Sequence, residues 1–452
     1  MDGRAVKIFI GLGAFLPLLL IGSWVAFVLP QMGTMGTADR AAALSSILAQ
    51  NGLVFLVVLV VLGSRTRVVE HFIGLDRMIR THRPLALLTF GLLLCHVAFQ
   101  GVRFYALGGK DLALSALVGS TVWEMTVGRM SLLLVLLVAM AALSGKILRV
   151  PFILWKPLHG LAYGAVPLAF AHALFRGTTM GEGLRFGVWL VLLSIFLGVS
   201  LGRLIKILRG SRILCQVEQI VPETHDTVSV WLRPLKETGK LAPRRAGQFA
   251  LLRLATKRGF SEPHPFTISG PPEDQVLRFT IKRTGSFTQR IHRLSSGDRI
   301  LYEGPFGVFL ADVNRYSSLA LIAGGVGITP FLSLLRHFQV TSQAVPTVLL
   351  YANKTLKDII AREELSAMAQ TMPLQVVHVL SRETFPNGYP EDGPRVLFLK
   401  GHITAEILKS QLQADQGFYL CGPPAMQQTV LKEIRAAFGL KPSSVSRELF
   451  FW

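Results

Sequence analysis

The sequence predicts a multidomain chain with three successive folds. Residues 1–210 contain six long apolar runs and are expected to form a six-helix transmembrane bundle. Residues 211–312 alternate short runs of strand-forming residues with Gly and Pro turns, a pattern typical of a small antiparallel β-barrel, and its strands are expected at 227–232, 247–254, 277–282 and 298–303. Residues 313–452 alternate apolar strands, expected at 319–323, 347–351, 374–380 and 417–420, with helical stretches, which predicts a doubly wound α/β domain with a parallel sheet.

The composition agrees with a membrane protein. Of the 452 residues, 51% are hydrophobic and only 16% are charged, which is too apolar for an ordinary soluble protein. The net charge of +20 would fit a nucleic-acid partner, but residues 1–210 alone hold 19 Lys and Arg against 7 Asp and Glu. Loops that stay in the cytoplasm collect such cations, so we expect membrane lipid and no nucleic acid as a partner. The three cysteines form no CxxC pair and therefore predict neither a zinc site nor a disulfide framework.

The apolar runs also predict the topology. They place the helices at 8–29, 44–63, 84–102, 128–144, 157–175 and 185–206. Pro84 and Pro157 stand where a proline is tolerated, in the first turn of the third and fifth helices. The segments that follow the second, fourth and sixth runs are the richer in Lys and Arg, so both termini are expected in the cytoplasm, with the chain in the cell (inner) membrane.

Four histidines lie at the third and fifth predicted helices. His82 and His96 are 14 residues apart, and His159 and His172 are 13 residues apart. At a rise of ~1.5 Å per residue, each spacing covers about 20 Å, which is most of a ~30 Å hydrocarbon core. Since both helices run from inside to outside, His82 is expected to pair with His159 at the inner face, and His96 with His172 towards the outer face. Two such bis-imidazole sites, one above the other, are the arrangement needed to hold two haem irons.

The angular positions of the histidines around the helix axis support this arrangement fully on only one of the two helices. At ~100° per residue, His82 and His96 fall within ~40° of each other, whereas His159 and His172 fall ~140° apart. Pro167 lies between the second two, and we expect it to distort that helix. A helix–helix hydrogen bond is the alternative role for any single buried histidine. Four histidines paired at matching depth favour the haem interpretation.

The predicted barrel carries residue types that a flavin requires. In the segment His264-Pro265-Phe266-Thr267-Ile268-Ser269, Phe266 offers a ring face, Thr267 a hydroxyl and His264 a donor for phosphate. A basic glycine turn that opens a helix follows at residues 282–288 and suits an anion. Each segment alone is a weak signal, but together they predict an FAD site. Its expected contacts are His264, Pro265, Phe266, Thr267, Ser269, Lys282, Gly285 and Thr288.

The α/β domain carries a second set of motifs at the ends of its predicted strands. Residues 323–330, Ala-Gly-Gly-Val-Gly-Ile-Thr-Pro, follow the first strand and open a helix, where a backbone free of side chains can approach a pyrophosphate. Ser381 and Arg382 end the third strand and could clamp the 2′-phosphate of NADPH. Cys421 ends the fourth strand, where it would face the nicotinamide. The expected NADPH contacts are Gly324, Gly325, Gly327, Thr329, Ser381, Arg382, Cys421, Gly422 and Pro423.

The chain ends in Glu448-Leu449-Phe450-Phe451-Trp452, of which residues 449–452 are expected to form a terminal strand. Phe450 and Trp452 would share one face of that strand. An aromatic side chain at a chain terminus can lie over a flavin ring until nicotinamide displaces it, although a plain core strand is an equal alternative. Thr267, Cys421 and Phe450 are therefore the residues expected at the reacting atoms.

These motifs, in this order, resemble the NADPH oxidase / ferric reductase superfamily in its bacterial form, and the soluble half also resembles ferredoxin–NADP reductases. The resemblance rests on the four histidines, His-Pro-Phe-Thr-Ile-Ser, Gly-Gly-Val-Gly-Ile-Thr-Pro, Cys-Gly-Pro-Pro-Ala-Met and the aromatic tail. It implies two b-type haems, an FAD barrel and an NADPH domain. It also implies that His264 meets the FAD phosphates, Phe266 packs on the isoalloxazine and Thr267 approaches its N5 atom.

The activity that the resemblance implies is electron transfer across the membrane, from cytoplasmic NADPH through FAD and the two haems to an external acceptor. Oxygen, which would give superoxide, and ferric chelates are both open as that acceptor. An alternative is an electron donor to a quinone or to a periplasmic redox partner. A transporter of haem or ions with a fused reductase is a third, non-enzymatic interpretation. The sequence identifies no protein partner.

Overall fold

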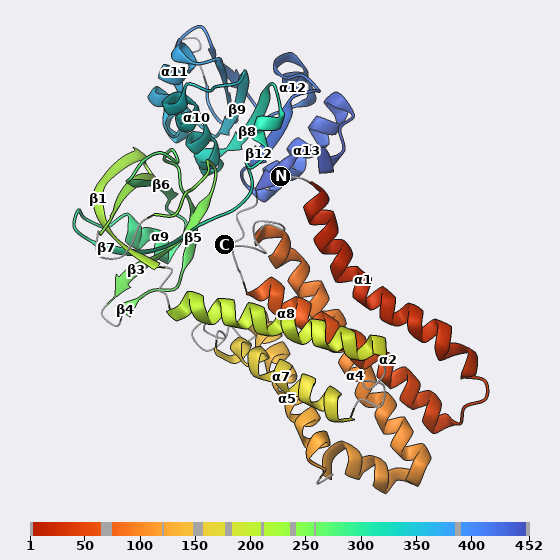
Figure 1. Cartoon of the computed structure of the whole chain (residues 1–452). Coiled ribbons are helices and arrows are strands. Elements are labelled where there is room, and N and C mark those ends of the chain that lie inside the picture. Colours follow the sequence, from red (N-terminus) through yellow and green to blue (C-terminus); the bar gives the residue numbers. More distant parts are fainter. Residues whose placement is uncertain are drawn as a thin grey trace. The chain divides into compact units, whose positions relative to one another are not determined.

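The computed structural model of the chain describes residues 3–64, 75–119, 122–147, 157–176, 183–208, 212–235, 241–256, 259–384 and 390–448 (Figure 1). It divides into two compact units, Asp2–Leu208 and Arg209–Trp452. The first unit is helical and the second contains two sheets. The division between the units falls close to the predicted end of the membrane domain at residue 210, and the further division at residue 312 stays a prediction.

Long helices make up the described part of the first unit. Their bounds are α1 Gly3–Phe27, α2 Thr37–Gly63, α4 Leu75–Leu114, α5 Trp123–Ile147, α7 Ala162–Arg176 and α8 Gly183–Leu208. Five described spans are long and apolar enough to cross a membrane: Thr37–Gly63, Arg80–Gly119, Trp123–Ala142, Pro157–Arg176 and Phe186–Ile205. Phe15–Gln31 is a shorter apolar helical stretch, so the prediction of six spans stays a prediction.

The third predicted helix begins earlier than expected. Pro84 was expected in its first turn and His82 just before it, but α4 begins at Leu75 and contains both residues. Hydropathy detects the part of a helix that lies in lipid, whereas the polar stretch before Pro84 is helical without being apolar. Gly108 and Gly109 interrupt the helical geometry near the other end of α4, so the part that holds His82 and His96 is continuous.

The fifth predicted helix is distorted, as expected, but at a different residue. Pro167 lies inside α7. The helical pattern breaks instead at Leu161, between a short helical stretch at residues 157–160 and the start of α7. There the Leu161 N–H donates to the Leu158 carbonyl, and the Gly164 N–H donates to the Leu161 carbonyl. These tighter i to i+3 bonds change the rotation between His159 and His172 relative to an ideal helix.

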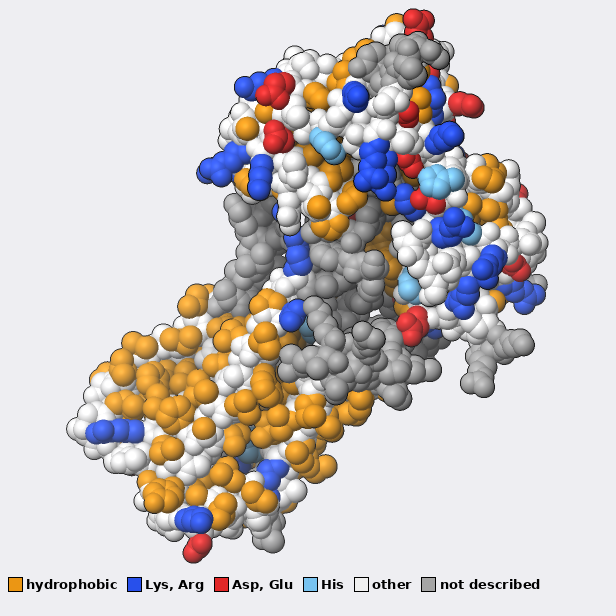
Figure 2. Space-filling model, turned by 180° about the vertical axis from the view of Figure 1, so that it is seen from behind, with side chains coloured by type: hydrophobic (Ala, Val, Ile, Leu, Met, Phe, Trp, Pro, Cys, Tyr) orange, Lys and Arg blue, Asp and Glu red, His pale blue; other side chains and the backbone are white. Residues whose placement is uncertain are grey.

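The outer surface of the helical unit is apolar. Figure 2 shows hydrophobic side chains over most of the visible face of this unit. Large side chains such as Leu18, Met140 and Leu197 are more than half exposed. Its interior is also apolar, with Val54 and Val57 of α2 among the buried residues. A unit that is apolar inside and outside is suited to lipid rather than to water.

The second unit begins with an antiparallel sheet. Its strands are β1 Arg212–Thr224, β2 Thr227–Pro234, β3 Phe249–Thr256, β4 Gly259–Phe260, β5 His264–Thr267, β6 Leu277–Lys282 and β7 Arg299–Phe306. They follow the order β4-β3-β7-β1-β2-β6, with β5 paired to β3. A bridge between Ile268 and Phe279 connects the end of β5 to β6, which supports the predicted barrel without establishing its closure. Helix α9, Ser286–Ile291, follows β6.

A six-stranded parallel sheet forms the rest of this unit. Its strands are β8 Leu319–Gly324, β9 Thr347–Asn353, β10 Leu374–Leu380, β11 Val396–Lys400, β12 Gly417–Cys421 and β13 Ser446–Glu448. Helices α10 Thr329–Thr341 and α11 Arg362–Thr371 pack on one face, and α12 Ala405–Gln411 and α13 Pro424–Phe438 pack on the other (Figure 1). The doubly wound arrangement is therefore present as predicted.

The order of this sheet, β11-β10-β9-β8-β12-β13, has one reversal. The chain builds outward from β8 through β9, β10 and β11, and then returns to the other side of β8 as β12. Parallel sheets bind ligands at the carboxyl ends of the strands where the order reverses. The residues that follow β8 and β12 therefore occupy the position at which a nucleotide is expected.

Candidate functional site

The structure brings the four histidines together in the two predicted pairs. The ring centroids of His82 and His159 are 6.0 Å apart, with an angle of 61° between the rings. Those of His96 and His172 are 6.5 Å apart, with an angle of 70°. His82 and His96 lie 14 residues apart on α4, so a rise of ~1.5 Å per residue separates the two pairs by about 21 Å.

Both pairs fit an iron atom with two axial imidazoles. Two metal–nitrogen bonds of about 2 Å, placed end to end through one metal atom, would set the ring centroids about 6 Å apart. Within the described ranges, no group of three or more His, Cys, Asp or Glu side chains could hold a metal ion. Each pair offers two nitrogens, the number of axial positions that a porphyrin leaves on its iron.

Hydrogen bonds orient the rings of the second pair. Nδ1 of His96 lies 3.1 Å from the Ser45 carbonyl oxygen and 2.8 Å from the Ser45 hydroxyl. Nδ1 of His172 lies 2.9 Å from the Glu124 carbonyl oxygen. Because a carbonyl can only accept, each Nδ1 carries the proton, and each Nε2 keeps its lone pair. Metal-bound histidines commonly donate the N–H of their other ring nitrogen to a protein oxygen in this way, which fixes the orientation of the ring.

A glycine on α5 makes room for one of these rings. A Cβ atom at Gly128 would lie 2.6 Å from Nδ1 of His172, closer than real Cβ atoms approach. Sequence reasoning missed Gly128 and also Ser45, because each acts from a helix that carries none of the four histidines. A glycine or a serine in an apolar helix gives no signal in one sequence, since both are common there.

In the second unit, β5 presents the predicted flavin residues together. The His264 ring stacks on Phe287 of α9 with centroids 3.9 Å apart, and Phe266 lies 5.8 Å from the same ring. The Thr267 hydroxyl is buried and has no hydrogen-bond partner among the described residues. A buried hydroxyl without a partner is costly, so a ligand atom at Thr267 would complete the site. Phe287 is the residue here that sequence reasoning left without a role.

The ionisation of His264 reflects its surroundings. Burial lowers the pKa of His264 below its usual value, and the nearby Arg290 acts in the same direction against the opposing charge of Glu262. The imidazole is therefore neutral at pH 7. It can donate one hydrogen bond to a phosphate, but it brings no charge unless an anion raises its pKa.

Three side chains that were predicted to contact the flavin instead form hydrogen bonds or an ion pair within the protein. The Thr288 hydroxyl accepts the N–H groups of Thr284 and Gly285, both at 2.9 Å, so it shapes the start of α9. Lys282 forms an ion pair with Asp226 at 3.0 Å. Ser269 is fully buried, and its hydroxyl lies 2.9 Å from that of Thr280, which argues against direct contact with a cofactor. Gly285 has open space around it, and Pro265 is partly exposed on β5.

Gly324, at the end of β8, and Gly325 and Gly327 after it have different roles. A Cβ at Gly324 would collide with Met426, and one at Gly327 would collide with the Cys421 carbonyl. A Cβ at Gly422 would lie 3.1 Å from the Gly324 nitrogen, which is tighter than most real Cβ contacts. These contacts hold the two predicted nucleotide segments together at the point where the strand order reverses. Only Gly325 combines a positive φ of 53° with open space, so it is the glycine best placed to approach a phosphate.

The side chains at the end of β12 are mostly turned into the protein. Cys421 is fully buried in the core, and burial raises the pKa of its thiol well above the usual value, with Glu448 on the neighbouring strand β13 adding to the effect. A protonated, buried thiol is suited to forming one wall of a site rather than to acting as a nucleophile. Thr329 donates its hydroxyl to the Val326 carbonyl at 3.1 Å, whereas Pro423 is exposed.

Two cationic residues meet at the ends of β9 and β10. The Arg382 N–H donates to the Lys354 carbonyl at 2.8 Å, and both side chains are exposed. Ser381 is tied to the Asn353 carbonyl through its N–H at 3.1 Å. Sequence reasoning missed Lys354, because the predicted strand ends at Tyr351, whereas β9 continues to Asn353, directly before Lys354. The predicted tail residues Phe450 and Trp452 lie outside the described residues.

Comparison with protein families agrees with this organisation. Residues 48–170 match the ferric reductase like transmembrane component, residues 219–311 an FAD-binding domain, and residues 321–432 the oxidoreductase NAD-binding domain. The chain is therefore a multi-pass transmembrane oxidoreductase with an FAD- and NAD(P)H-binding reductase module. It belongs to the NADPH oxidase / ferric reductase superfamily, as its motifs predict.

Individual relatives match the reductase module. The gamma subunit of sulfhydrogenase 2 from Pyrococcus furiosus is 30% identical over 206 residues, 44% of this chain and 70% of that protein. NADH-cytochrome b5 reductase 2 from Debaryomyces hansenii is 30% identical over 187 residues, and the chain spans 60% of its length. The FAD/NAD binding domain of nitric oxide dioxygenase from Vibrio cholerae is similar in structure at 21% identity, covering 53% of this chain and 98% of that domain with a TM-score of 0.46.

Proposed function

We propose that the protein carries electrons from cytoplasmic NADPH, through one FAD and two b-type haems, to an acceptor on the outer side of the inner membrane, with both of its termini in the cytoplasm. The acceptor is oxygen, which would yield superoxide, or a ferric chelate. The observation that supports this proposal most strongly is the pairing of four histidines at two depths. The ring centroids are 6.0 Å apart in the pair His82 and His159, and 6.5 Å apart in the pair His96 and His172.

The two units of the chain would bind different cofactors. His82, His96, His159 and His172 would hold the two haems. On β5, Phe266 and Thr267 would hold the flavin ring, and His264 would bind its phosphates. When bound, a flavin accepts two electrons as hydride and releases them singly, and bis-histidine haems carry single electrons without an open iron position.

NADPH is proposed over NADH because of the exposed pair Lys354 and Arg382. A guanidinium and an ammonium at the ends of β9 and β10 would recognise a phosphate that NADH lacks. The names of the cytochrome b5 reductases specify NADH, so the two nucleotides must be compared directly. A kcat/KM for NADH equal to or above that for NADPH would contradict this part of the proposal.

The test is a reduced-minus-oxidised spectrum of the purified full chain with haem and flavin quantification. We expect two b-type haems and one FAD per chain, and reduction of the haems on addition of NADPH. Absence of haem in fully loaded material would reduce the proposal to a membrane-bound flavin reductase.

The acceptor is identified by measuring superoxide formation and ferric-chelate reduction side by side. A cytochrome c signal that superoxide dismutase fails to block would exclude the oxidase. Slow turnover with both acceptors would contradict the proposal and support transfer to a quinone or a periplasmic redox protein instead.

A further inference from the structure

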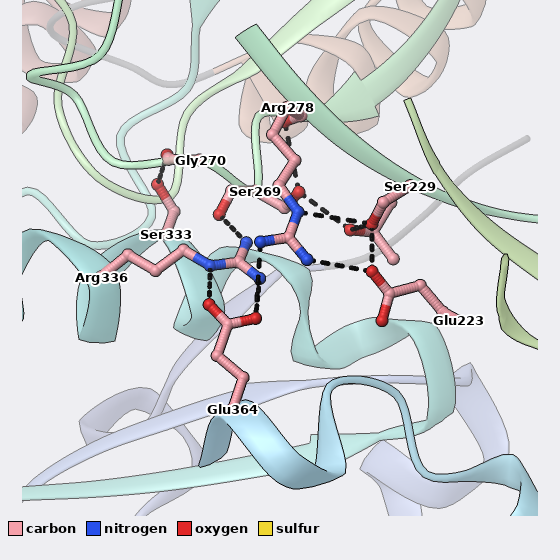
Figure 3. Close-up of polar contacts among 9 residues, drawn as sticks. Glu223, Ser229, Ser269, Gly270, Arg278, Ser333, Arg336 and Glu364 are labelled. Atoms are coloured by element: carbon pink, nitrogen blue, oxygen red, sulfur yellow. Dashed lines mark hydrogen bonds and ion pairs between the residues drawn. The ribbon is translucent and has the colours of Figure 1, made fainter. Parts of the chain in front are cut away.

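One face of α10 binds the turn that follows β5. Ser333, Arg336 and His337 are spaced three and four residues apart, so their side chains lie on one side of the helix. The Ser333 hydroxyl donates to the Gly270 carbonyl at 2.8 Å, and Nη1 of Arg336 donates to the Ser269 carbonyl (Figure 3). Nδ1 of His337 lies 2.7 Å from a carboxylate oxygen of Glu273, also in this turn.

Arg336 is buried, and each of its three guanidinium nitrogens donates a hydrogen bond. Only 4% of the residue is exposed. Its Nε and Nη2 atoms form a fork with the Glu364 carboxylate of α11 at 2.6 and 2.7 Å, while Nη1 holds Ser269. Burial alone would raise the pKa of Glu364, but the hydrogen bonds and charge of Arg336, aided by Arg278, lower it. The carboxylate is therefore charged, and the fork has fixed geometry.

A second arginine extends this network into the antiparallel sheet. Arg278 of β6 lies between two carboxylates, with Nη2 3.0 Å from Glu223 and Nη1 3.4 Å from Glu364 (Figure 3). Gly270 permits the close packing, because a Cβ there would lie 3.2 Å from Cβ of Arg278. Negative and positive groups thus alternate from the antiparallel sheet through α11 to α10, in the order Glu223, Arg278, Glu364 and Arg336.

The network joins the two candidate nucleotide sites along the chain. Thr267, whose hydroxyl has no partner among the described residues, stands two residues before Ser269. Helix α10 begins at Thr329, directly after the 3-10 turn Gly325–Ile328, and reaches Arg336 seven residues later. The end of the flavin strand and the helix that begins at the dinucleotide turn are therefore fixed to each other by Arg336 and Ser333.

We propose that Arg336, supported by Ser333, is a positioning residue for hydride transfer, which sets the alignment of nicotinamide against flavin by fixing β5 to α10. This inference rests on the proposed function. The transfer moves one hydride, with its two electrons, from dihydronicotinamide to the flavin, and leaves the oxidised nucleotide and a flavin reduced by two electrons. Arg336 is buried and bonded to Ser269 and Glu364, so its effect would be on the alignment of the reactants, where a displacement of about 1 Å can cost about 100-fold in rate.

The experiment measures reduction of bound FAD by NADPH in the full chain, by stopped flow, for the wild type, Arg336→Met and Ser333→Ala. We expect Arg336→Met to keep its FAD and its half-saturating NADPH concentration, while the limiting rate of flavin reduction falls about 10- to 100-fold. Ser333→Ala should show a smaller fall of the same kind. Arg435→Met, on the exposed side of α13, is the matched control and should keep the wild-type rate.

Each outcome has a defined meaning. A wild-type limiting rate in Arg336→Met overturns the proposal, and so does a loss explained wholly by weaker NADPH binding. If Arg336→Met fails to retain FAD, Ser333→Ala decides, because an unchanged limiting rate there also overturns it. A wild-type protein whose FAD is reduced by neither NADPH nor NADH contradicts the proposed function instead, before any variant is compared.

Discussion

At the scale of single residues, the geometry of the proposed outer haem site depends on the absence of a side chain at Gly128. Gly128 of α5 leaves the space in which the His172 imidazole lies, with its Nδ1 bonded to the Glu124 carbonyl. A methyl group there would overlap the ring, and a helix backbone cannot shift without disturbing its own hydrogen bonds. The neighbouring helix α5 thus fixes the position of Nε2 of His172, the nitrogen proposed to bind iron.

Gly128→Ala should displace His172 and weaken the outer haem, while the inner haem is retained. Overpacking of this kind typically costs about 1–3 kcal/mol, enough to lower haem occupancy by roughly 10-fold or more. The measurement is haem per chain together with the two midpoint potentials. Gly198→Ala is the matched control, because no neighbouring atom of the described residues lies within 4 Å of a Cβ at Gly198. Two haems at unchanged potentials in Gly128→Ala would contradict the packing argument.

His378 is a second residue whose surroundings decide its chemistry. It is fully buried on β10, stacks on Phe398 with centroids 4.9 Å apart, and has no hydrogen-bond partner for either ring nitrogen among the described residues. Burial lowers the pKa of His378 to about 4. Since the unfolded chain binds this proton near the ordinary value of about 6.5, the stability that neutral His378 gives is complete above that pH.

Acid should therefore destabilise the α/β part through His378, with a loss that grows as the pH falls from about 6.5 to about 4. The shift corresponds to a loss on the order of 3 kcal/mol when complete. His378→Leu should flatten this dependence, which thermal unfolding of the full chain at pH 7.5 and 5.0 measures. His225→Gln, at an exposed histidine, should keep the wild-type dependence. An equal loss of stability in His378→Leu would assign the acid sensitivity to other groups.

At the scale of elements, the sequence predicts strands and helices well where one physical signal dominates. The bounds expected for β6, residues 277–282, are those observed, because β-type residues stand between clear turns. β1 was missed, since its alternating buried residues Ile213, Cys215 and Val217 follow an apolar helix without a turn signal. β11, Val396–Lys400, was also missed, because five residues carry too little periodicity.

The ends of β9 and β10 allow a test of nucleotide choice at this scale. Arg382→Ala should lower kcat/KM for NADPH by roughly 10-fold or more, because one charge-assisted contact to the 2′-phosphate is lost, and should leave NADH turnover unchanged. Lys354→Ala should act in the same direction with a smaller effect. Steady-state kinetics with both nucleotides measure this. Equal losses for NADPH and NADH would show that these residues support the fold rather than the phosphate.

At the scale of the whole molecule, the candidate sites were predictable where their chemistry requires particular side chains. The pairing of His82 with His159 and of His96 with His172 followed from residue type, spacing and depth. Ser45, Gly128 and Arg336 could not be predicted, because each acts through a contact between elements distant in sequence. A serine, a glycine or an arginine is common in every fold, and only the three-dimensional structure shows what it touches.

The proposed electron path is serial, and this makes it testable by removing one histidine. His96→Leu keeps the volume of the side chain but removes the outer axial nitrogen, together with its bonds to Ser45. We expect loss of the outer haem and a fall of at least about 100-fold in reduction of the external acceptor, because electrons can no longer leave the inner haem within the span of α4. Reduction of FAD and of the inner haem by NADPH should persist at the wild-type rate, because the residues proposed to bind these two cofactors precede His96 in the proposed electron path and are unchanged. His71→Leu is the control for loss of a histidine that the sequence assigns to no pair, and it should retain both haems. If His96→Leu also abolishes flavin reduction, or if external reduction continues without the outer haem, the two histidine pairs do not act in series and the path through the membrane must be a different one.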